Sequence, residues 1–504
     1  MEIRPAEISE ILKKQIASFD TETDVAETGQ VLSVGDGIAR VFGLTNVLAG
    51  EMVDFPNAGV KGMALNLETD NVGIVIFGED RAIREGDTVT RTGQIVDVPV
   101  GKGLLGRVVD ALGNPIDGKG PIETTERRLV EVKAPGIMPR QSVTEPMMTG
   151  LKAIDALVPV GRGQRELIIG DRQTGKTTLT LDAIINQKGK NVFCVYCWVG
   201  GAHASLMKVI HALQEMGALE YTVVVAASAS SSAGEQYLAP YVAAAMGEYF
   251  MYSGRDSLVV FDDLTKHAWI YRELSLLLER SPGREAYPGD IFYLHSQLME
   301  RAGRLNSELG SGSMSFLPIV ETLQGDITGY VQSNLVSMTD GQVYISSSLF
   351  HEGFKPAIDL GLSVSRIGSK VQSEALREVS DTLRLDYAQY KELIRLMRVK
   401  TKLSTEIAEK LRRGEALTRV LVQDAHKPVS DLALVIQLYA FKRKILEILS
   451  PEGLSVFLRE IMNYLAETRP QVLKTLEGQK ILSVETKQEL DRAFVEFFRE
   501  KKIV

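Results

Sequence analysis

Residues 166–185 consist of Glu166-Leu167-Ile168-Ile169, then Gly170-Asp171-Arg172-Gln173-Thr174-Gly175-Lys176-Thr177, then Thr178-Leu179-Thr180-Leu181-Asp182-Ala183-Ile184-Ile185. The central octapeptide fits the phosphate-loop pattern G-x-x-x-x-G-K-[ST]. The apolar residues before it predict a buried strand, and those after it are compatible with a helix. In this setting we expect backbone N–H groups to surround phosphate oxygens, Lys176 to reach the terminal phosphates and Thr177 to ligate Mg²⁺. The stretch from Gly170 to Thr178 therefore predicts a site for a nucleoside triphosphate with magnesium.

A candidate acid for the same site follows a second apolar run, Leu258-Val259-Val260-Phe261-Asp262-Asp263. Asp262 directly ends the run, so we expect it to contact the magnesium ion through water. The alternative is that both aspartates only cap or solvate the end of a strand.

Composition excludes several other classes of function. The chain has 504 residues, enough for two to four domains, and a formal net charge of −8. An acidic balance argues against nucleic acid as the main partner, because binding a phosphate backbone needs excess Lys and Arg. No apolar stretch approaches the roughly 18–20 residues of a membrane span. The N-terminal residues lack a secretory or transit composition. We therefore expect any membrane association to run through partners.

The two cysteines, Cys194 and Cys197, form a C-x-x-C inside the apolar run 191–199. A redox pair or a zinc site would explain that spacing. In a strand, however, residues three apart point to opposite faces, and zinc needs two more ligands. The sequence favours two buried cysteines of a strand.

Four segments follow along the chain. Residues 1–24 predict an amphipathic docking helix, because Ile8, Ile11, Leu12 and Ile16 repeat at helical spacing; packing of that helix on its own chain is the alternative. Residues 25–95 predict a small closed β-barrel of short strands, with a hairpin turn at Gly35-Asp36-Gly37.

Residues 96–372 alternate apolar strands with helical patterns, which predicts a doubly wound, mostly parallel sheet with nucleotide at the strand C-termini. The strand candidates are 167–169, 192–199, 222–226, 258–261 and 316–321. Residues 373–504 predict a helical domain with helices at 376–398, 403–411, 431–449, 453–467 and 487–502.

The chain resembles the alpha subunits of F-type ATP synthases over essentially its whole length. The strings that carry the resemblance are 105–115 (LGRVVDALGNP), 149–155 (TGLKAID), 161–177 (GRGQRELIIGDRQTGKT), 282–290 (PGREAYPGD) and 364–368 (VSRIG). With this resemblance the expected fold class is α/β, with a small N-terminal β-barrel, a central RecA-like doubly wound phosphate-loop domain and a C-terminal helical bundle.

The resemblance implies a ring of three alpha and three beta subunits around a gamma-like central stalk. Catalysis belongs to beta, whereas alpha holds Mg-ATP or Mg-ADP without hydrolysis and lends an arginine to the beta site next door. Motif matching places that arginine at Arg366, with Ser363 and Ser365 in the same interface loop. Residues 1–20 are expected to bind a delta-like peripheral stalk. The resemblance also implies a complex on the cytoplasmic face of a bacterial inner membrane, or on the matrix or stroma face of an organelle membrane.

The chain also departs from the family pattern. Beta subunits carry a water-activating glutamate after the second core strand, and alpha subunits usually carry glutamine there, whereas this chain has Gly201. A glycine can neither activate nor orient a water, which favours a non-catalytic site. In the expected adenine pocket, Lys355-Pro356 has Lys where Arg is usual. Gln423 is the one glutamine left of two, and Ala425 replaces the other.

Two alternatives belong to other classes. A catalytic ring ATPase subunit of the beta, flagellar or secretion type needs a carboxylate after the second core strand, and Gly201 argues against it. A hexameric RNA motor resembling the terminator Rho needs exposed aromatics and a basic surface in its N-terminal module. Residues 29–93 hold only Phe42, Phe55 and Phe77 as aromatics, and the net charge is negative.

Overall fold

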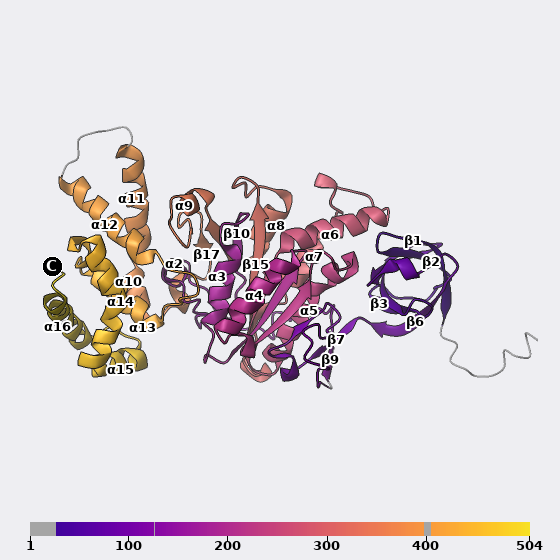
Figure 1. The fold of residues 1–504 in the computed structure, drawn as a ribbon, viewed down its shortest axis with the longest axis horizontal. Coiled ribbons are helices and arrows are strands. Elements are labelled where there is room, and N and C mark those ends of the chain that lie inside the picture. Colours follow the sequence, from indigo (N-terminus) through magenta and orange to yellow (C-terminus); the bar gives the residue numbers. More distant parts are fainter. Residues whose placement is uncertain (1–26, 125, 398–404, 504) are drawn as a thin grey trace, which may run out of the picture. The chain divides into compact units, whose positions relative to one another are not determined.

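A computed structural model describes residues 27–124, 126–397 and 405–503 (Figure 1). The predicted docking helix at 1–24 lies outside the described residues. The chain divides into two compact units. Among the described residues, the first contains those up to Val96 together with Ser232–Gly234, and the second contains those of Asp97–Ser231 and those from Glu235 onward.

The first unit is a closed β-barrel, which confirms the prediction. Its strands are β1 (Thr28–Gly35), β2 (Ile38–Phe42), β3 (Glu51–Phe55), β4 (Val60–Leu67), β5 (Val72–Phe77) and β6 (Thr88–Ile95). They follow the order β1-β2-β5-β4-β3-β6, and β6 pairs back with β1, so the sheet closes without a free edge. Asp36 and Gly37 join β1 to β2 with φ of 52° and 79°, as a type I′ hairpin turn requires.

The second unit is built on a mixed, mostly parallel sheet with the strand order β17-β16-β10-β15-β13-β11-β12-β8. Its strands are β8 (Val108–Val109), β10 (Leu167–Asp171), β11 (Val192–Val199), β12 (Thr222–Ala227), β13 (Asp256–Asp262), β14 (Gly303–Arg304), β15 (Ser313–Thr322), β16 (Gly341–Ile345) and β17 (Val364–Ser365). Strands β14 and β17 pair antiparallel with their neighbours. A separate ribbon pairs β7 (Asp97–Val100) with β9 (Glu126–Leu129). All five predicted strands are present, and β15 lies between β10 and β13.

Helices alternate with these strands in the chain (Figure 1). They are α2 (Lys152–Leu157), α3 (Lys176–Ile185), α4 (His203–Glu215), α5 (Ala233–Tyr252), α6 (Leu264–Leu277), α7 (Ile291–Met299), α8 (Tyr330–Met338) and α9 (Ser347–His351). The α/β fold class is therefore confirmed. Among the described residues, no helix combines the length and apolar character that crossing a bilayer demands.

After residue 373 the described residues form only helices, as predicted. They are α10 (Glu374–Ser380), α11 (Leu383–Met397), α12 (Thr405–Leu421), α13 (Asp431–Lys442), α14 (Pro451–Thr468), α15 (Pro470–Gln479) and α16 (Val484–Lys501). Serine side chains accept from backbone N–H groups at four of the helix N-termini, which satisfies donors that the helix itself leaves free. These caps are Ser373, Ser430, Ser450 and Ser483.

Three helix predictions were wrong in their extent. The continuous helix predicted at 376–398 is two helices that separate at Asp381–Thr382, where the Lys442 ammonium bonds the Glu378 carbonyl and the Asp381 carboxylate and so favours a helix end. The helix predicted at 403–411 continues to Leu421. The helix predicted at 431–449 ends at Lys442, shortly before Lys444 at φ 60°.

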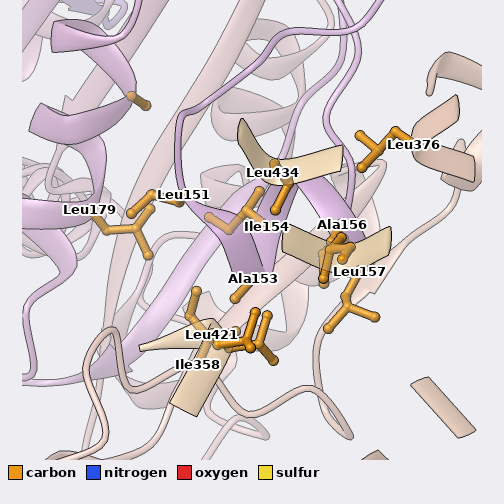
Figure 2. Packing of buried hydrophobic residues seen from close by; sticks show 14 of the residues in the cluster. Leu151, Ala153, Ile154, Ala156, Leu157, Leu179, Ile358, Leu376, Leu421 and Leu434 are labelled. Atoms are coloured by element: carbon orange, nitrogen blue, oxygen red, sulfur yellow. The ribbon is translucent and has the colours of Figure 1, made fainter. Parts of the chain in front are cut away.

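The C-terminal helices share one apolar core with the sheet domain (Figure 2). Ala153, Ile154 and Leu157 of α2 belong to the same buried cluster as Leu421 of α12 and Leu434 of α13. Burial of apolar area is the main favourable term in folding, so this cluster stabilises both parts together.

Both cysteines lie in β11, buried and free of disulfides. The prediction of two buried strand cysteines is confirmed, and burial raises the pKa of the Cys194 thiol. A thiol held in that state is a poor nucleophile and a poor metal ligand.

Candidate nucleotide site

The phosphate-loop sequence forms the predicted turn between β10 and α3. Gln173 and Gly175 have φ of 59° and 97°, and a Cβ on Gly170 would lie 2.5 Å from the Ile345 carbonyl oxygen. Close packing therefore requires a glycine at 170, and the backbone conformation favours a glycine at 175. The Lys176 ammonium is buried and donates to the carbonyl oxygens of Gly170 at 2.9 Å and Asp171 at 2.5 Å. Burial lowers the pKa of Lys176.

The Asp171 carboxylate anchors the loop to the neighbouring strands. It accepts from the Thr322 hydroxyl at 2.6 Å, from the Gly325 N–H at 2.8 Å and from the Ser347 hydroxyl. Burial opposes ionisation, yet these donors hold the pKa of Asp171 below its ordinary value. Its side chain therefore holds the loop in shape and is occupied by bonds within the chain. Thr174 adds a bond within the loop, from its hydroxyl to the Asp171 carbonyl at 2.8 Å.

Thr177 and Asp262 meet at the carboxyl edge of the sheet. The Thr177 hydroxyl donates to Asp262 Oδ2 at 2.7 Å, and the Tyr196 hydroxyl donates to the same oxygen at 2.7 Å. Burial raises the pKa of Asp262, although these two bonds oppose the rise. The structure thus brings together the two residues predicted to serve magnesium.

This oxygen pair fits a Mg²⁺ ion, which prefers oxygen ligands and usually completes its shell with waters and substrate phosphates. Nowhere in the described residues do three or more Asp, Glu, His or Cys side chains gather in a way that could hold a metal ion. Bound there, it would neutralise phosphate charge. Asp263 is used differently, because it caps α6 through the Lys266 N–H and pairs with the Lys266 ammonium at 2.8 Å.

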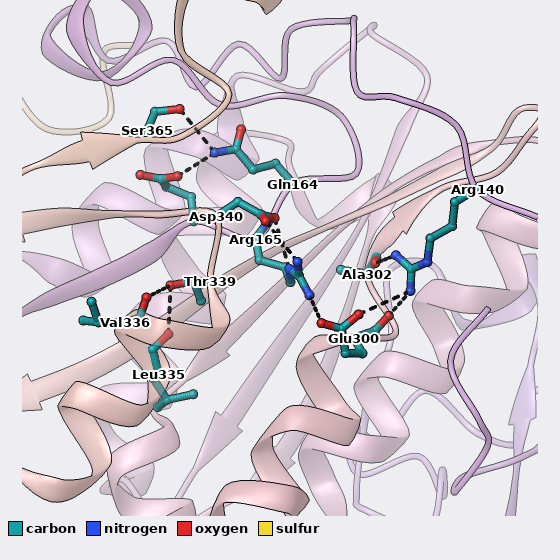
Figure 3. A network of polar contacts seen from close by, with 11 residues as sticks. Arg140, Gln164, Arg165, Glu300, Ala302, Leu335, Val336, Thr339, Asp340 and Ser365 are labelled. Atoms are coloured by element: carbon teal, nitrogen blue, oxygen red, sulfur yellow. Dashed lines mark hydrogen bonds and ion pairs between the residues drawn. The ribbon is translucent and has the colours of Figure 1, made fainter. Parts of the chain in front are cut away.

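Arg366 follows the edge strand β17, and its loop is held by a polar network (Figure 3). The Arg366 N–H donates to the Asp340 carbonyl at 2.8 Å. The Asp340 carboxylate in turn receives two bonds from the Arg165 guanidinium, at 3.0 and 2.9 Å, and one from the Arg165 N–H at 3.1 Å. Arg165 also pairs with Glu300 at 2.6 Å. The backbone that carries Arg366 is therefore fixed, while its side chain is exposed.

The second half of this network is buried. Gln164 donates to Glu166 Oε2 at 2.7 Å and to the Ser365 hydroxyl at 3.3 Å. Burial raises the pKa of Glu166 well above its ordinary value. The Ser365 hydroxyl donates to the Pro159 carbonyl at 2.7 Å, and the fully buried Ser363 hydroxyl donates to the Asp359 carbonyl at 2.6 Å. Both serines thus bond their own chain and position the loop of Arg366.

Three family models match the chain. The β-barrel domain of the ATP synthase alpha/beta family matches residues 24–93, its nucleotide-binding domain matches 150–365, and its C-terminal domain matches 372–497. The chain belongs to the ATP synthase alpha/beta family. Its phosphate loop therefore lies in a domain of this family that binds nucleotide, and the chain belongs to an ATP synthase-type complex.

In this alpha/beta-family chain, the residues predicted for an adenine pocket lie together. The Gln423 N–H donates to the Lys355 carbonyl at 2.9 Å. The Gln423 side chain donates to the carbonyls of Gly150 and Lys427 and accepts from the Lys152 N–H. Both amide N–H groups of Gln423 are thus bonded within the chain. For contact with a nucleotide base, the Gln423 side chain retains only the second lone pair of its oxygen and the faces of its planar amide. The Lys355 ammonium lies 4.8 Å from the Phe350 ring centroid, and Pro356 follows it.

The Arg172 side chain, predicted as a nucleotide ligand, is 61% exposed and forms an ion pair with Glu321 at 2.7 Å. Its guanidinium also lies 5.7 Å from the Trp269 ring centroid. This side chain is thus directed to the end of β15 and to α6, and Gln173 beside it is exposed. Thr178 lies within the first turn of α3, half-buried.

Gly201 follows β11, and its neighbour Trp198 is a residue that the sequence reasoning missed. A Cβ on Gly201 would lie 2.2 Å from Cζ2 of the Trp198 indole. The glycine is therefore required by space, while the left-handed φ of 63° belongs to Gly200. The only signal of this contact in the sequence was an aromatic residue three positions before a glycine. A side chain at 201 could enter only if the indole moved.

Proposed function

We propose that this chain is the non-catalytic, Mg-nucleotide-binding alpha-type subunit of a rotary ATP synthase. The observation that carries the proposal is the pair Gly201 and Trp198. After β11 comes Gly200-Gly201-Ala202-His203, so no carboxylate stands there to activate water, and the indole fills the adjoining space. Removing a proton from the attacking water needs a positioned general base.

The carboxylates at this edge of the sheet have other partners, which supports the same proposal. Asp262 accepts from Thr177 and Tyr196. Asp263 is paired with Lys266, and Glu321 with Arg172. Asp262 is thus placed to serve magnesium, Asp263 caps a helix and pairs with a lysine, and Glu321 pairs with an arginine. The site is therefore suited to hold a magnesium nucleotide without hydrolysing it.

The proposal includes a ring with catalytic beta-type subunits and a gamma-like central stalk. Arg366 would act in trans, as an arginine finger at the site of the neighbouring subunit. Its fixed backbone and exposed side chain suit that role, because a finger must reach across an interface in one geometry. The complex would lie at a membrane surface, on the cytoplasmic face in a bacterium or the matrix or stroma face in an organelle.

The purified full-length chain should bind Mg-ATP and hydrolyse it negligibly. Lys176→Ala should weaken Mg-ATP binding about 10- to 100-fold, because it removes a charged hydrogen bond to phosphate. Lys208→Ala, on the exposed face of α4, is the matched control and should bind as the wild type does. Equilibrium dialysis and a phosphate-release assay measure both quantities. Turnover by the isolated chain in the usual enzyme range of about 1–10³ s⁻¹ would contradict the non-catalytic assignment.

Deleting residues 1–20 should spare ring assembly but release the peripheral stalk subunit. The motivation is the apolar stripe Ile8, Ile11, Leu12 and Ile16, a pattern typical of helices that bind in a groove. Retention of the stalk subunit during affinity purification of the complex is the measurement. A matched variant with Lys13→Ala and Lys14→Ala, off the stripe, should retain the stalk. Equal retention by the deletion variant would refute the docking role.

A further inference from the structure

The indole N–H of Trp198 is a buried hydrogen-bond donor that has no acceptor within the described part of the chain. The Trp198 side chain is 6% exposed. Indole nitrogen can only donate, and buried donors in native proteins are nearly always paired. An acceptor that belongs to a ligand would explain this exception.

Trp198 stands at the nucleotide site. In the parallel pairing of β11 with β13, Trp198 is in register with Asp262. It shares a face of β11 with Tyr196, and the two rings stack with centroids 6.5 Å apart. The Tyr196 hydroxyl bonds the same Asp262 oxygen that receives the Thr177 hydroxyl. In the sheet, the strand order from the phosphate loop is β10, β15, β13 and β11. Trp198 on β11 is therefore one strand farther from the loop than Asp262 on β13.

A cation and a glycine backbone lie beside the ring. The Lys266 ammonium lies 5.8 Å from the indole centroid and also pairs with Asp263. The bare backbone at Gly201 lies against the N–H edge, since a Cβ there would be 2.9 Å from Nε1. A side chain at that position would overlap the edge of the ring that carries the N–H.

We propose that the Trp198 indole N–H donates a hydrogen bond to the terminal phosphate of a bound nucleoside triphosphate and makes this site prefer triphosphate over diphosphate. The inference rests on the proposed function, in which Mg-nucleotide occupies the loop. The loop and Lys176 reach the β-phosphate, which tri- and diphosphates share, as well as the terminal phosphate. A donor on the far side of Asp262 is expected to meet the last phosphate alone. Because indole cannot accept a proton, Trp198 binds this end of the nucleotide without activating water.

Trp198→Phe in the full-length chain tests the inference, because it keeps a ring and removes the N–H. The dissociation constant for Mg-ATP should rise about tenfold or more, as expected for one hydrogen bond to a charged group, while that for Mg-ADP stays within about twofold. Damage to the fold or to the loop would weaken both ligands, so the ratio of the two constants is the readout. Lys176→Ala is the contrasting variant and should weaken both.

Tryptophan emission gives a second measurement. The emission of Trp198 is the difference between the wild-type spectrum and that of Trp198→Phe. Addition of Mg-ATP should change this difference, and addition of Mg-ADP should leave it unchanged. If Trp198→Phe does not fold, site-specific 3-benzothienylalanine at 198, which replaces the N–H with sulfur, gives the same comparison. An unchanged ratio of the constants would overturn the role of Trp198 and leave the proposed function standing. A wild-type chain that bound neither nucleotide would overturn both.

Discussion

Arg366→Ala should lower multi-site ATP turnover of the assembled ring by about 10³-fold or more, the range measured for arginine fingers. A guanidinium is always charged and can serve several phosphoryl oxygens at once. In this chain Arg366 is exposed and follows the edge strand β17. Its charge interacts electrostatically with the buried Glu166. The nucleotide bound to this chain should stay bound, because its loop and Arg366 occupy separate strands.

The measurement is steady-state ATP hydrolysis by the ring, with ring assembly checked by size-exclusion chromatography. Lys370→Ala, an exposed cation of the same segment, is the matched control and should keep turnover near that of the wild type. Arg366→Lys keeps the charge and loses the planar guanidinium, so its turnover should lie between that of Arg366→Ala and that of the control. Turnover of Arg366→Ala within threefold of the wild type would show that another residue supplies the charge.

The sequence pattern predicted those parts of the fold that depend only on residues close together in the sequence. The phosphate loop, the hairpin turn at Asp36-Gly37 and the five predicted strands depend on short stretches of backbone and on continuous apolar runs. Strand β16 was missed because it alternates buried with half-buried residues and so forms no continuous apolar run. The break between α10 and α11 was missed by the sequence pattern, and Lys442, which bonds the end of α10, is distant in sequence and becomes a neighbour only in the folded chain.

The candidate site shows the same limit. Motif spacing placed Thr177 and Asp262 in one site, and the structure brings them to 2.7 Å. The motif did not distinguish backbone from side-chain roles. The carboxylate of Asp171, the guanidinium of Arg172 and the amide of Gln423 all bond their own chain. Trp198 was missed for a related reason, since the lack of a hydrogen-bond acceptor is a property of its tertiary surroundings.

The pair of Arg301 and Glu248 is a further feature that only the structure reveals. Their side chains are 1% and 3% exposed. Two parallel bonds join them, from Nε to Oε1 at 2.7 Å and from Nη2 to Oε2 at 2.9 Å. Nη1 donates to the Val130 carbonyl at 2.8 Å. Glu248 lies on α5, and Arg301 follows α7, so the pair joins two helices within the sheet domain.

Glu248→Leu should lower the free energy of unfolding of the sheet domain by about 3–5 kcal/mol. The cost comes from Arg301, because a guanidinium does not lose its proton in proteins and would be left buried without its hydrogen-bonded carboxylate. Glu131, which interacts with Arg301 only electrostatically, would be its remaining counter-charge. The double variant Glu248→Leu with Arg301→Met should recover most of that loss, since apolar replacement of a whole buried pair is often close to neutral. Recovery will be incomplete, because the Val130 carbonyl loses its donor.

Urea unfolding followed by tryptophan emission measures this effect, because both tryptophans, Trp198 and Trp269, lie in β11 and α6 of the sheet domain. The control is Arg492→Ala, whose pair with Glu489 has an arginine side chain that is 67% exposed. Exposed pairs contribute about 0–1 kcal/mol, so this control should unfold near the wild-type midpoint. A loss for Glu248→Leu no larger than that of Arg492→Ala would mean that water reaches Arg301 once the glutamate is gone. A double variant less stable than Glu248→Leu alone would mean that the carbonyl bonds of Arg301 outweigh the burial of its charge.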